Sequence, residues 1–107
     1  MKEYQECIEA CQACTLACEH CASSCLAEDN VAMMARCISL DHSCADLCSI
    51  AAREMARRSP FAAALCQVCA DACDACGEEC AKHDVGHCQE CAAACRRCAE
   101  ECRKMAA

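Results

Sequence analysis

The sequence predicts an all-α protein, an antiparallel up-down-up-down four-helix bundle whose core is lined by cysteine. Nineteen of the 107 residues are cysteine, and in three stretches they recur at steps of three and four. Those steps place side chains on the face of a helix that packs against other helices. Glycine and proline number only two and one, which favours helices over a loop-rich fold. Short turns between the helices make neighbours antiparallel.

The first predicted helix covers residues 2–27, and a turn at residues 28–30 follows it. The turn contains Asp and Asn, which are suited to capping the next helix. The second predicted helix covers residues 30–57 and ends in several arginines. Basic residues favour a helix C-terminus because they interact well with its partial negative charge. These two helices therefore form the first antiparallel pair.

The third predicted helix covers residues 60–82, with Ser59 as its N-cap and Pro60 as its first residue. Proline is favoured there because the first helical N–H has no partner in the helix. A turn follows in which Asp84 is a candidate cap. The fourth predicted helix covers residues 85–104 and again ends in basic residues.

The cysteines of the first, third and fourth predicted helices share one repeated pattern, C-Q-x-C-x-x-A-C-x-x-C-x-x-x-C. The second helix keeps the phase with fewer sulfurs, and Asp41 occupies one of its core-facing positions. A carboxylate is a poor ligand for a soft metal, so we expect Asp41 to hydrogen-bond a neighbouring thiol or backbone group. All the cysteines are candidate metal ligands: Cys7, Cys11, Cys14, Cys18, Cys21, Cys25, Cys37, Cys44, Cys48, Cys66, Cys69, Cys73, Cys76, Cys80, Cys88, Cys91, Cys95, Cys98 and Cys102.

The spacing of the cysteines favours Cu(I) among the soft metals that thiolates bind. The motif C-x3-C occurs eight times, and each copy places two sulfurs on adjacent helical turns with room for one ion between them. Two ligands suit the low coordination number of Cu(I), whereas structural zinc takes four. The spacings of iron–sulfur loops are absent. A zinc- or cadmium-buffering protein of the metallothionein type is the alternative.

A thiol redox sensor or a disulfide-stabilised protein is a further alternative. An odd number of cysteines cannot pair completely within one chain. Residues at i and i+4 of a helix also have Cβ atoms about 5–6 Å apart, against about 3.8 Å in a disulfide. Cysteine as an inert core filler is the simplest interpretation, but Ala or Leu fill a core without the risk of oxidation.

Composition limits the partners and the location. A net charge of −7 argues against nucleic acid, and no run of about 18 apolar residues is present to span a membrane. The opening residues contain neither an apolar signal region nor a twin arginine, so we expect a cytoplasmic protein. No nucleophile is paired with a base, so we expect no enzyme. Residues 1–107 form one predicted domain because no linker divides them.

Three segments carry a close resemblance to the cytosolic bacterial copper storage proteins. They are LDHSCADLC (residues 40–48), ALCQVCADACDACGEECAKHD (residues 64–84) and HCQECAAACRRCAEECRKMAA (residues 87–107). The resemblance covers essentially the whole chain. It implies many Cu(I) ions bound by core thiolates, mostly in two-cysteine sites, near one copper per cysteine. It also implies a homotetramer with a storage or sequestration role, for which a copper chaperone or a small-molecule donor is a candidate partner.

The antiparallel arrangement predicts two different ends of the bundle. One end collects Cys25, Met34, Cys37, Cys80, His83 and Cys88, and the other collects Tyr4, Met55, Phe61, Leu65 and Met105 as an apolar plug. The resemblance implies an open end with His and Met ligands and a closed hydrophobic end. We therefore treat His83, His87 and Met34 as candidate metal ligands at the open end.

The remaining positions are expected on the outside. His20 and His42 fall on outward positions, and the acidic residues Glu78, Glu79, Glu100 and Glu101 are expected on a solvated face. Outward apolar residues are candidates for contacts between subunits: Ile8, Leu16, Ile38, Leu47 and Val68.

Overall fold

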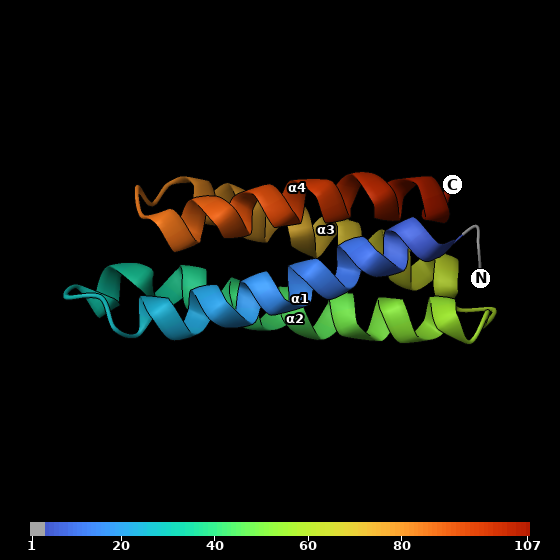
Figure 1. The fold of residues 1–107 in the computed structure, drawn as a ribbon, viewed down its shortest axis with the longest axis horizontal. Coiled ribbons are helices and arrows are strands. Elements are labelled where there is room, and N and C mark those ends of the chain that lie inside the picture. The colour runs from blue at the N-terminus through green and yellow to red at the C-terminus, as the bar shows by residue number, and fades with distance from the viewer. Residues whose placement is uncertain (1–3) are drawn as a thin grey trace.

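The computed structural model describes residues 4–107 and consists of helices joined by short turns, with no strand among those residues (Figure 1). In chain order the elements are α1 (Gln5–Cys25), the short 3-10 helix η2 (Val31–Met34), α2 (Ala35–Ala56), α3 (Ala62–Ala81) and α4 (Gly86–Ala106). Successive α-helices run in opposite directions, which confirms the predicted up-down-up-down bundle. No helix in the described part is long and apolar enough to cross a membrane.

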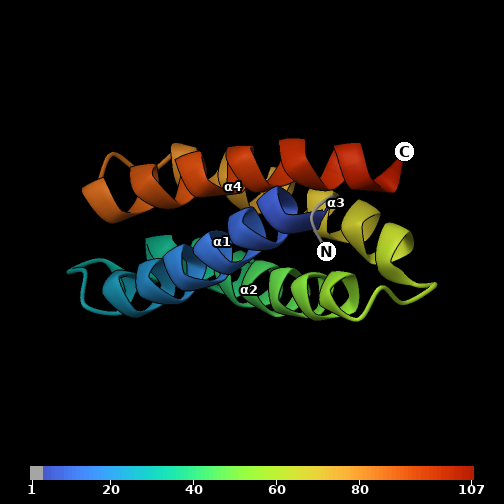
Figure 2. The ribbon, with the colours of Figure 1, turned by 45° about the vertical axis from the view of Figure 1, so that its right-hand side comes forward.

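The bundle is a rod of about 44 × 17 × 17 Å. Helix α1 packs on α2 and α4, and α3 packs on the same two helices, so the four surround one central column (Figure 2). The turns after α1 and α3 lie at one end, which we call the mouth end. The turn between α2 and α3, the start of α1 and the end of α4 lie at the other, which we call the closed end.

The second and third helices begin differently from the prediction. A turn of 3-10 helix, Val31–Met34, precedes α2, and the side chain of Asn30 makes no capping hydrogen bond. Helix α3 begins at Ala62 rather than at Pro60. The predicted role of Ser59 survives in part, because its Oγ accepts the N–H of Phe61 at 3.1 Å and so satisfies one amide ahead of the helix.

The start of α4 corrects another prediction. Asp84 does not cap the helix, because the N-cap position is Val85 and it makes no side-chain capping bond. The turn is held instead by Gln89, whose Nε2 donates to the carbonyl oxygens of His83 at 2.8 Å and Ala81 at 3.2 Å. The side chain of Gln89 therefore satisfies carbonyls that the end of α3 leaves without helical partners.

Small side chains let the helices approach closely. Alanines such as Ala51, Ala70 and Ala92 are fully buried beside the cysteines. At Gly77 of α3, an added Cβ would lie 3.2 Å from the Cβ of Cys95 on α4. Glycine therefore permits a contact between α3 and α4 that most side chains would disturb.

Candidate metal centre

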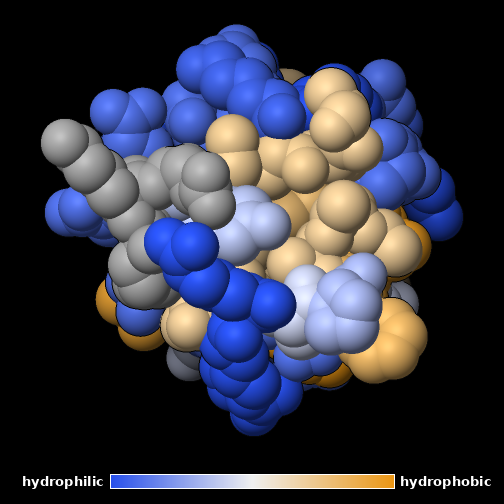
Figure 3. Space-filling model, turned by 90° about the vertical axis from the view of Figure 1, so that its right-hand side faces the viewer, coloured by the Kyte–Doolittle hydropathy of each residue, from blue (hydrophilic) through white to orange (hydrophobic). Residues whose placement is uncertain are grey.

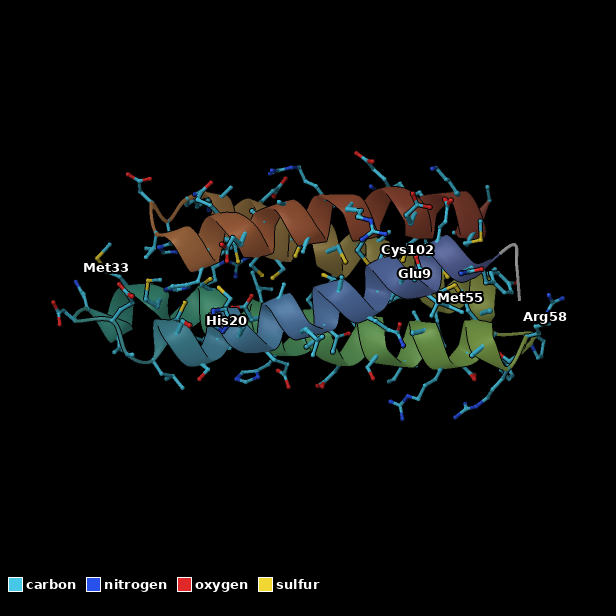
Figure 4. The ribbon with its side chains drawn as sticks, in the orientation of Figure 1. Glu9, His20, Met33, Met55, Arg58 and Cys102 are labelled. Atoms are coloured by element: carbon cyan, nitrogen blue, oxygen red, sulfur yellow. The ribbon has the colours of Figure 1, made fainter. Side chains whose placement is uncertain are left out.

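Every cysteine points into the column between the four helices. All nineteen are buried, each with an exposed fraction of 1% or less, and the sulfur atoms lie between the ribbons in Figure 4. All nineteen fall within the described residues and all are free thiols. The predicted cysteine-lined core is confirmed. Among the described residues no two cysteines form a disulfide, which is contrary to the disulfide-stabilised alternative.

The C-x3-C motifs bring sulfurs together within single helices. In five of the eight pairs the two Sγ atoms lie 3.9 Å apart: Cys14/Cys18, Cys21/Cys25, Cys44/Cys48, Cys76/Cys80 and Cys98/Cys102. Twice a metal–thiolate bond of about 2.3 Å, the value for zinc, is about 4.6 Å. An ion held linearly between two such sulfurs therefore requires them to separate by about 0.7 Å, which is within reach of small side-chain rotations.

The shortest sulfur–sulfur contacts join different helices. Cys37 Sγ lies 3.3 Å from Cys80 Sγ, and Cys69 Sγ lies 3.4 Å from Cys48 Sγ. Groups of four ligand atoms within 4.8 Å of one another form across helices, including Cys11/Cys69/Cys98/Cys102 and Cys14/Cys44/Cys48/Cys73. The thiols thus form a network, in which one sulfur can bridge two ions. Four sulfurs also match the coordination number of zinc, so these distances alone do not select the metal.

Asp41 lies among the thiols, fully buried. Its Oδ1 accepts hydrogen bonds from Cys76 at 3.1 Å, Cys91 at 3.3 Å and Cys80 at 3.5 Å, and its Oδ2 accepts one from Cys37 at 3.8 Å. The predicted hydrogen bonding of Asp41 to neighbouring thiols is confirmed. Asp41 therefore provides a carboxylate, a hard metal ligand, at a core position where its neighbours provide soft sulfur ligands.

At the mouth end a histidine joins three cysteines. The Nδ1 atom of His87 lies 3.6 Å from both Cys21 Sγ and Cys88 Sγ, and these atoms and Cys25 Sγ lie within 4.8 Å of one another. We call Cys21, Cys25, His87 and Cys88 the mouth cluster. His87 is therefore the candidate histidine that the structure brings to the thiols.

The other two candidate ligands at this end are placed differently. His83 points its Nε2 at the Oε2 of Glu79, 2.9 Å away, and has no thiol among its described hydrogen-bond partners. Met34 is buried, with an exposed fraction of 5%. Both residues line a hollow at the mouth end, together with Met33, whose side chain projects outward there (Figure 4).

Burial keeps the protons on Cys88 and Cys37, two thiols near the mouth. It raises the pKa of the Cys88 thiol to about 12. Burial also raises the pKa of Cys37, aided by the hydrogen bond to Cys80 and by the Asp41 charge. Loss of water disfavours the thiolate in both cases. A metal ion that binds here therefore has to displace protons.

Glu79 at the mouth end is buried, contrary to prediction. We expected it on a solvated face, but its exposed fraction is 8%. The hydrogen bond from His83 lowers the pKa of Glu79, and Arg36 Nε and Lys82 Nζ each lie 3.4 Å from its Oε1. The i, i+4 spacing of Glu79 and His83 is the signal in the sequence that predicts their pairing.

The closed end is apolar, as predicted, with one exception. Met55 is fully buried, and Tyr4, Leu65 and Met105 pack against the core. Phe61 is 63% exposed and does not belong to the plug, because it lies in the turn before α3. Figure 3 shows the apolar surface at this end.

Apart from Glu79 and Ile8, the residues predicted to face outward are exposed or half-buried. His20 and His42 are exposed, as are Leu16 and Val68, whereas Ile38 and Leu47 are half-buried. Ile8 was predicted to face outward, yet its exposed fraction is 8%. Ile8 is therefore part of the core and is not available for contacts with another subunit.

Comparison with known proteins places the whole chain in one group. The family model described as copper storage protein matches residues 1–107. The uncharacterized cysteine-rich protein YhjQ of Bacillus subtilis is 53% identical, and the match covers 100% of both chains. The solved Cu(I)-bound copper storage protein BsCsp3 is 51% identical, with a TM-score of 0.94 over 98% of this chain and 99% of that one. A cytosolic copper storage protein from Streptomyces lividans with five coppers is 40% identical, with a TM-score of 0.94 over 98% of this chain and 92% of the other.

Proposed function

Because this chain belongs to the copper storage protein family, we propose that it is a Cu(I) store. The nineteen core thiols hold many Cu(I) ions per chain. The observation that carries the proposal is the column of nineteen buried, unpaired thiols. Thiolates are soft ligands that favour Cu(I), and a dry core keeps the bound ions away from water and oxygen. The proposal assigns storage to the chain and no catalytic step.

The ligands in this proposal are all nineteen cysteines. The pairs within helices supply two sulfurs to one ion, and the contacts between helices let a thiolate bridge a second ion. The surroundings of Cys48 support such bridging, since Cys48 Sγ lies 3.9 Å from Cys44 Sγ, 3.7 Å from Cys73 Sγ and 3.4 Å from Cys69 Sγ. Sharing of this kind allows a capacity near one ion per cysteine.

Copper enters at the mouth end in this proposal. A donor, which is a copper chaperone or a small thiol-bearing molecule, delivers Cu(I) to His83, His87 and Met34, and ligand exchange passes the ion to the mouth cluster. The contact of His87 with Cys21 and Cys88 supports this route. At the closed end, by contrast, the side chains of Met55, Leu65 and Met105 make the described part of the bundle apolar. Each ion then displaces protons from the thiols that bind it.

We further propose that the chain acts as a cytoplasmic homotetramer. The exposed apolar side chains of Leu16 and Val68, 71% and 46% exposed, support an association of subunits, and the Streptomyces relative is described as cytosolic. Light scattering is expected to give four times the 11.5 kDa chain mass. A mass equal to one chain would contradict the assembly without affecting the storage role.

Titration of the fully reduced protein tests the storage role. With Cu(I) supplied from a Cu(I)-specific chelator, we expect the protein to withdraw copper until about one ion is bound per thiol, because thiolates can bridge. Zinc is titrated in parallel, since the metallothionein-like alternative predicts tight, stoichiometric zinc binding. Zinc that binds more tightly than Cu(I), or capacity for only one or two coppers, would contradict the proposal. Anomalous scattering at the copper edge then locates the ions.

A further inference from the structure

Two carboxylates hold the two histidines at the mouth end in the same way. The Nε2 of His87 lies 3.4 Å from Oε2 of Glu28, and the Nε2 of His83 lies 2.9 Å from Oε2 of Glu79. Both imidazoles are nearly buried, with side-chain exposures of 13% and 12%. Each ring therefore presents the same nitrogen to a carboxylate and leaves the other nitrogen for another partner.

We propose that Glu28 and Glu79 are positioning residues that select Nδ1 of His87 and His83 as the atom that receives Cu(I). This inference rests on the proposed storage function. An ionised carboxylate can only accept a hydrogen bond, so the ring must donate its Nε2–H. In a neutral ring Nδ1 then has no proton and offers its lone pair. Histidines that bind metals commonly donate the second N–H to a carboxylate in this manner.

The geometry of His87 shows the consequence directly. Its Nδ1 lies 3.6 Å from the sulfurs of Cys21 and Cys88, so the nitrogen that Glu28 leaves unprotonated is the one in the mouth cluster. With the opposite tautomer, Nδ1 would present an N–H toward the thiols and could not accept a metal ion. Glu28 thereby keeps the ring in the form that can act as a ligand.

The same carboxylates connect helices across the mouth end. Glu28 lies in the turn after α1, where its N–H donates to the carbonyl oxygen of Cys25 at 3.2 Å, and its side chain reaches His87 on α4. Glu79 on α3 pairs with Arg36 on α2 at 3.4 Å. One carboxylate thus ties α1 to α4, and the other ties α2 to α3. The histidines are held relative to the thiols by these links.

The tautomer is measured in the copper-free protein. Long-range 1H–15N spectra of the reduced protein are expected to show His83 and His87 protonated at Nε2 and unprotonated at Nδ1. Glu28→Ala is expected to redistribute the His87 tautomers and leave His83 unchanged, and Glu79→Ala is expected to do the reverse. Glu54→Ala is the matched control, because the Glu54 carboxylate also pairs with a nearby side chain, Arg57 at 2.8 Å, but near the closed end. Protonation at Nδ1 in the wild-type protein would overturn the proposal.

Copper transfer supplies the second measurement. Loading from a Cu(I)-specific chelator is expected to slow about 10-fold or more in Glu28→Ala, the scale seen when partners of metal-bound histidines are removed. Glu28→Gln is expected to restore most of the rate, because its amide oxygen can still accept the Nε2–H. Glu54→Ala is expected to load like the wild type. Equal rates for Glu28→Ala and Glu54→Ala would refute the role.

A double substitution separates positioning from general damage. If Glu28 acts through the imidazole, Glu28→Ala adds little to the effect of His87→Ala, whereas additive losses would show that Glu28 acts independently of His87 and would contradict the proposal. Far-ultraviolet circular dichroism checks that each variant is folded. A wild-type protein that binds no copper would refute the storage function, while the tautomers of the copper-free protein would still test the positioning role.

Discussion

A single carboxylate interrupts the sulfur column at Asp41. Four thiols donate hydrogen bonds to it, so each of these sulfurs has an oxygen acceptor as well as sulfur neighbours. Because oxygen is a poor ligand for Cu(I), Asp41 reduces the number of soft ligands in that part of the core. It also gives these thiols a partner before any metal arrives.

Asp41→Cys is therefore expected to raise the copper capacity. A thiol at this position adds a soft ligand next to Cys76, Cys80 and Cys91, so the number of bound Cu(I) ions should rise by about one per chain, given one ion per bridging thiolate. Competition with a Cu(I)-specific chelator measures the equivalents bound. Asp41→Ser, which is similar in size but has no sulfur, is the control and should show no increase. An equal capacity in both variants would contradict the expectation.

The raised pKa of the Cys88 thiol predicts that copper binding depends on pH. Its pKa is raised to about 12, so the thiol keeps its proton at neutral pH, and Cu(I) must displace that proton. Protons compete less as pH rises, so the apparent affinity should increase with pH, about tenfold per pH unit for each proton displaced, until the pKa is reached. Weakly buffered titrations with a pH indicator count the protons released. Release of no protons on loading would contradict this account.

The contact between α3 and α4 depends on Gly77. A side chain at this position would meet Cys95 on α4. A substitution there therefore changes how closely α3 and α4 can pack. The other glycine, Gly86 at the start of α4, has no atom within 4 Å of an added Cβ. The two glycines therefore form a matched pair for testing how closely these helices must pack.

Gly77→Leu is expected to lower the free energy of unfolding by about 1–3 kcal/mol, because a larger side chain in a packed contact forces the helices to shift. Gly86→Ala should stay within about 1 kcal/mol of the wild type, since alanine is a better helix former and has room there. Denaturant unfolding of the reduced, copper-free protein measures both. A Gly77→Leu variant as stable as Gly86→Ala would show that the contact tolerates separation.

Local sequence patterns predict the helices of this chain better than they predict where the helices begin and end. The helix at residues 60–82 was predicted from Ser59 and Pro60, and α3 occupies Ala62–Ala81. A single helix was predicted over residues 30–57, but its first turn is the separate 3-10 helix Val31–Met34. Helix ends depend on competing turn and capping bonds that differ by small free energies, so they are less predictable than the helices themselves.

We expect metal binding and folding to be coupled across the whole molecule. The copper-free core consists mainly of thiols and alanines, with little aromatic or aliphatic carbon to bury. Ions that bind only the folded arrangement stabilise it by mass action. In the described residues all four helices surround the one column, so the metal-binding core is also the core that holds the fold together.

Loading with Cu(I) is accordingly expected to raise the melting temperature, and removal of copper by an excess of Cu(I)-specific chelator should reverse the rise. The effect should be largest at high pH. The raised pKa of Cys88 stabilises the copper-free protein below its ordinary pKa of 9.0, and that contribution is lost as pH rises toward about 12. Calorimetry of both forms checks this, and equal melting temperatures would contradict it.

The sequence by itself determined the helices, their antiparallel order and the inward phase of the cysteines. These follow from steps of three and four residues, which place side chains on one helical face whatever the neighbours are. It also determined the position of Asp41 among the thiols, because that residue shares the same phase.

Only the tertiary structure decided which sulfurs of different helices meet, such as Cys37 and Cys80 at 3.3 Å. It likewise decided that His87 rather than His83 contacts the thiols, and that Glu79 is buried. Such contacts depend on how far each helix is rotated and shifted against its neighbours. Packing of the whole bundle sets that geometry. It cannot be predicted from the spacing of residues along a single helix.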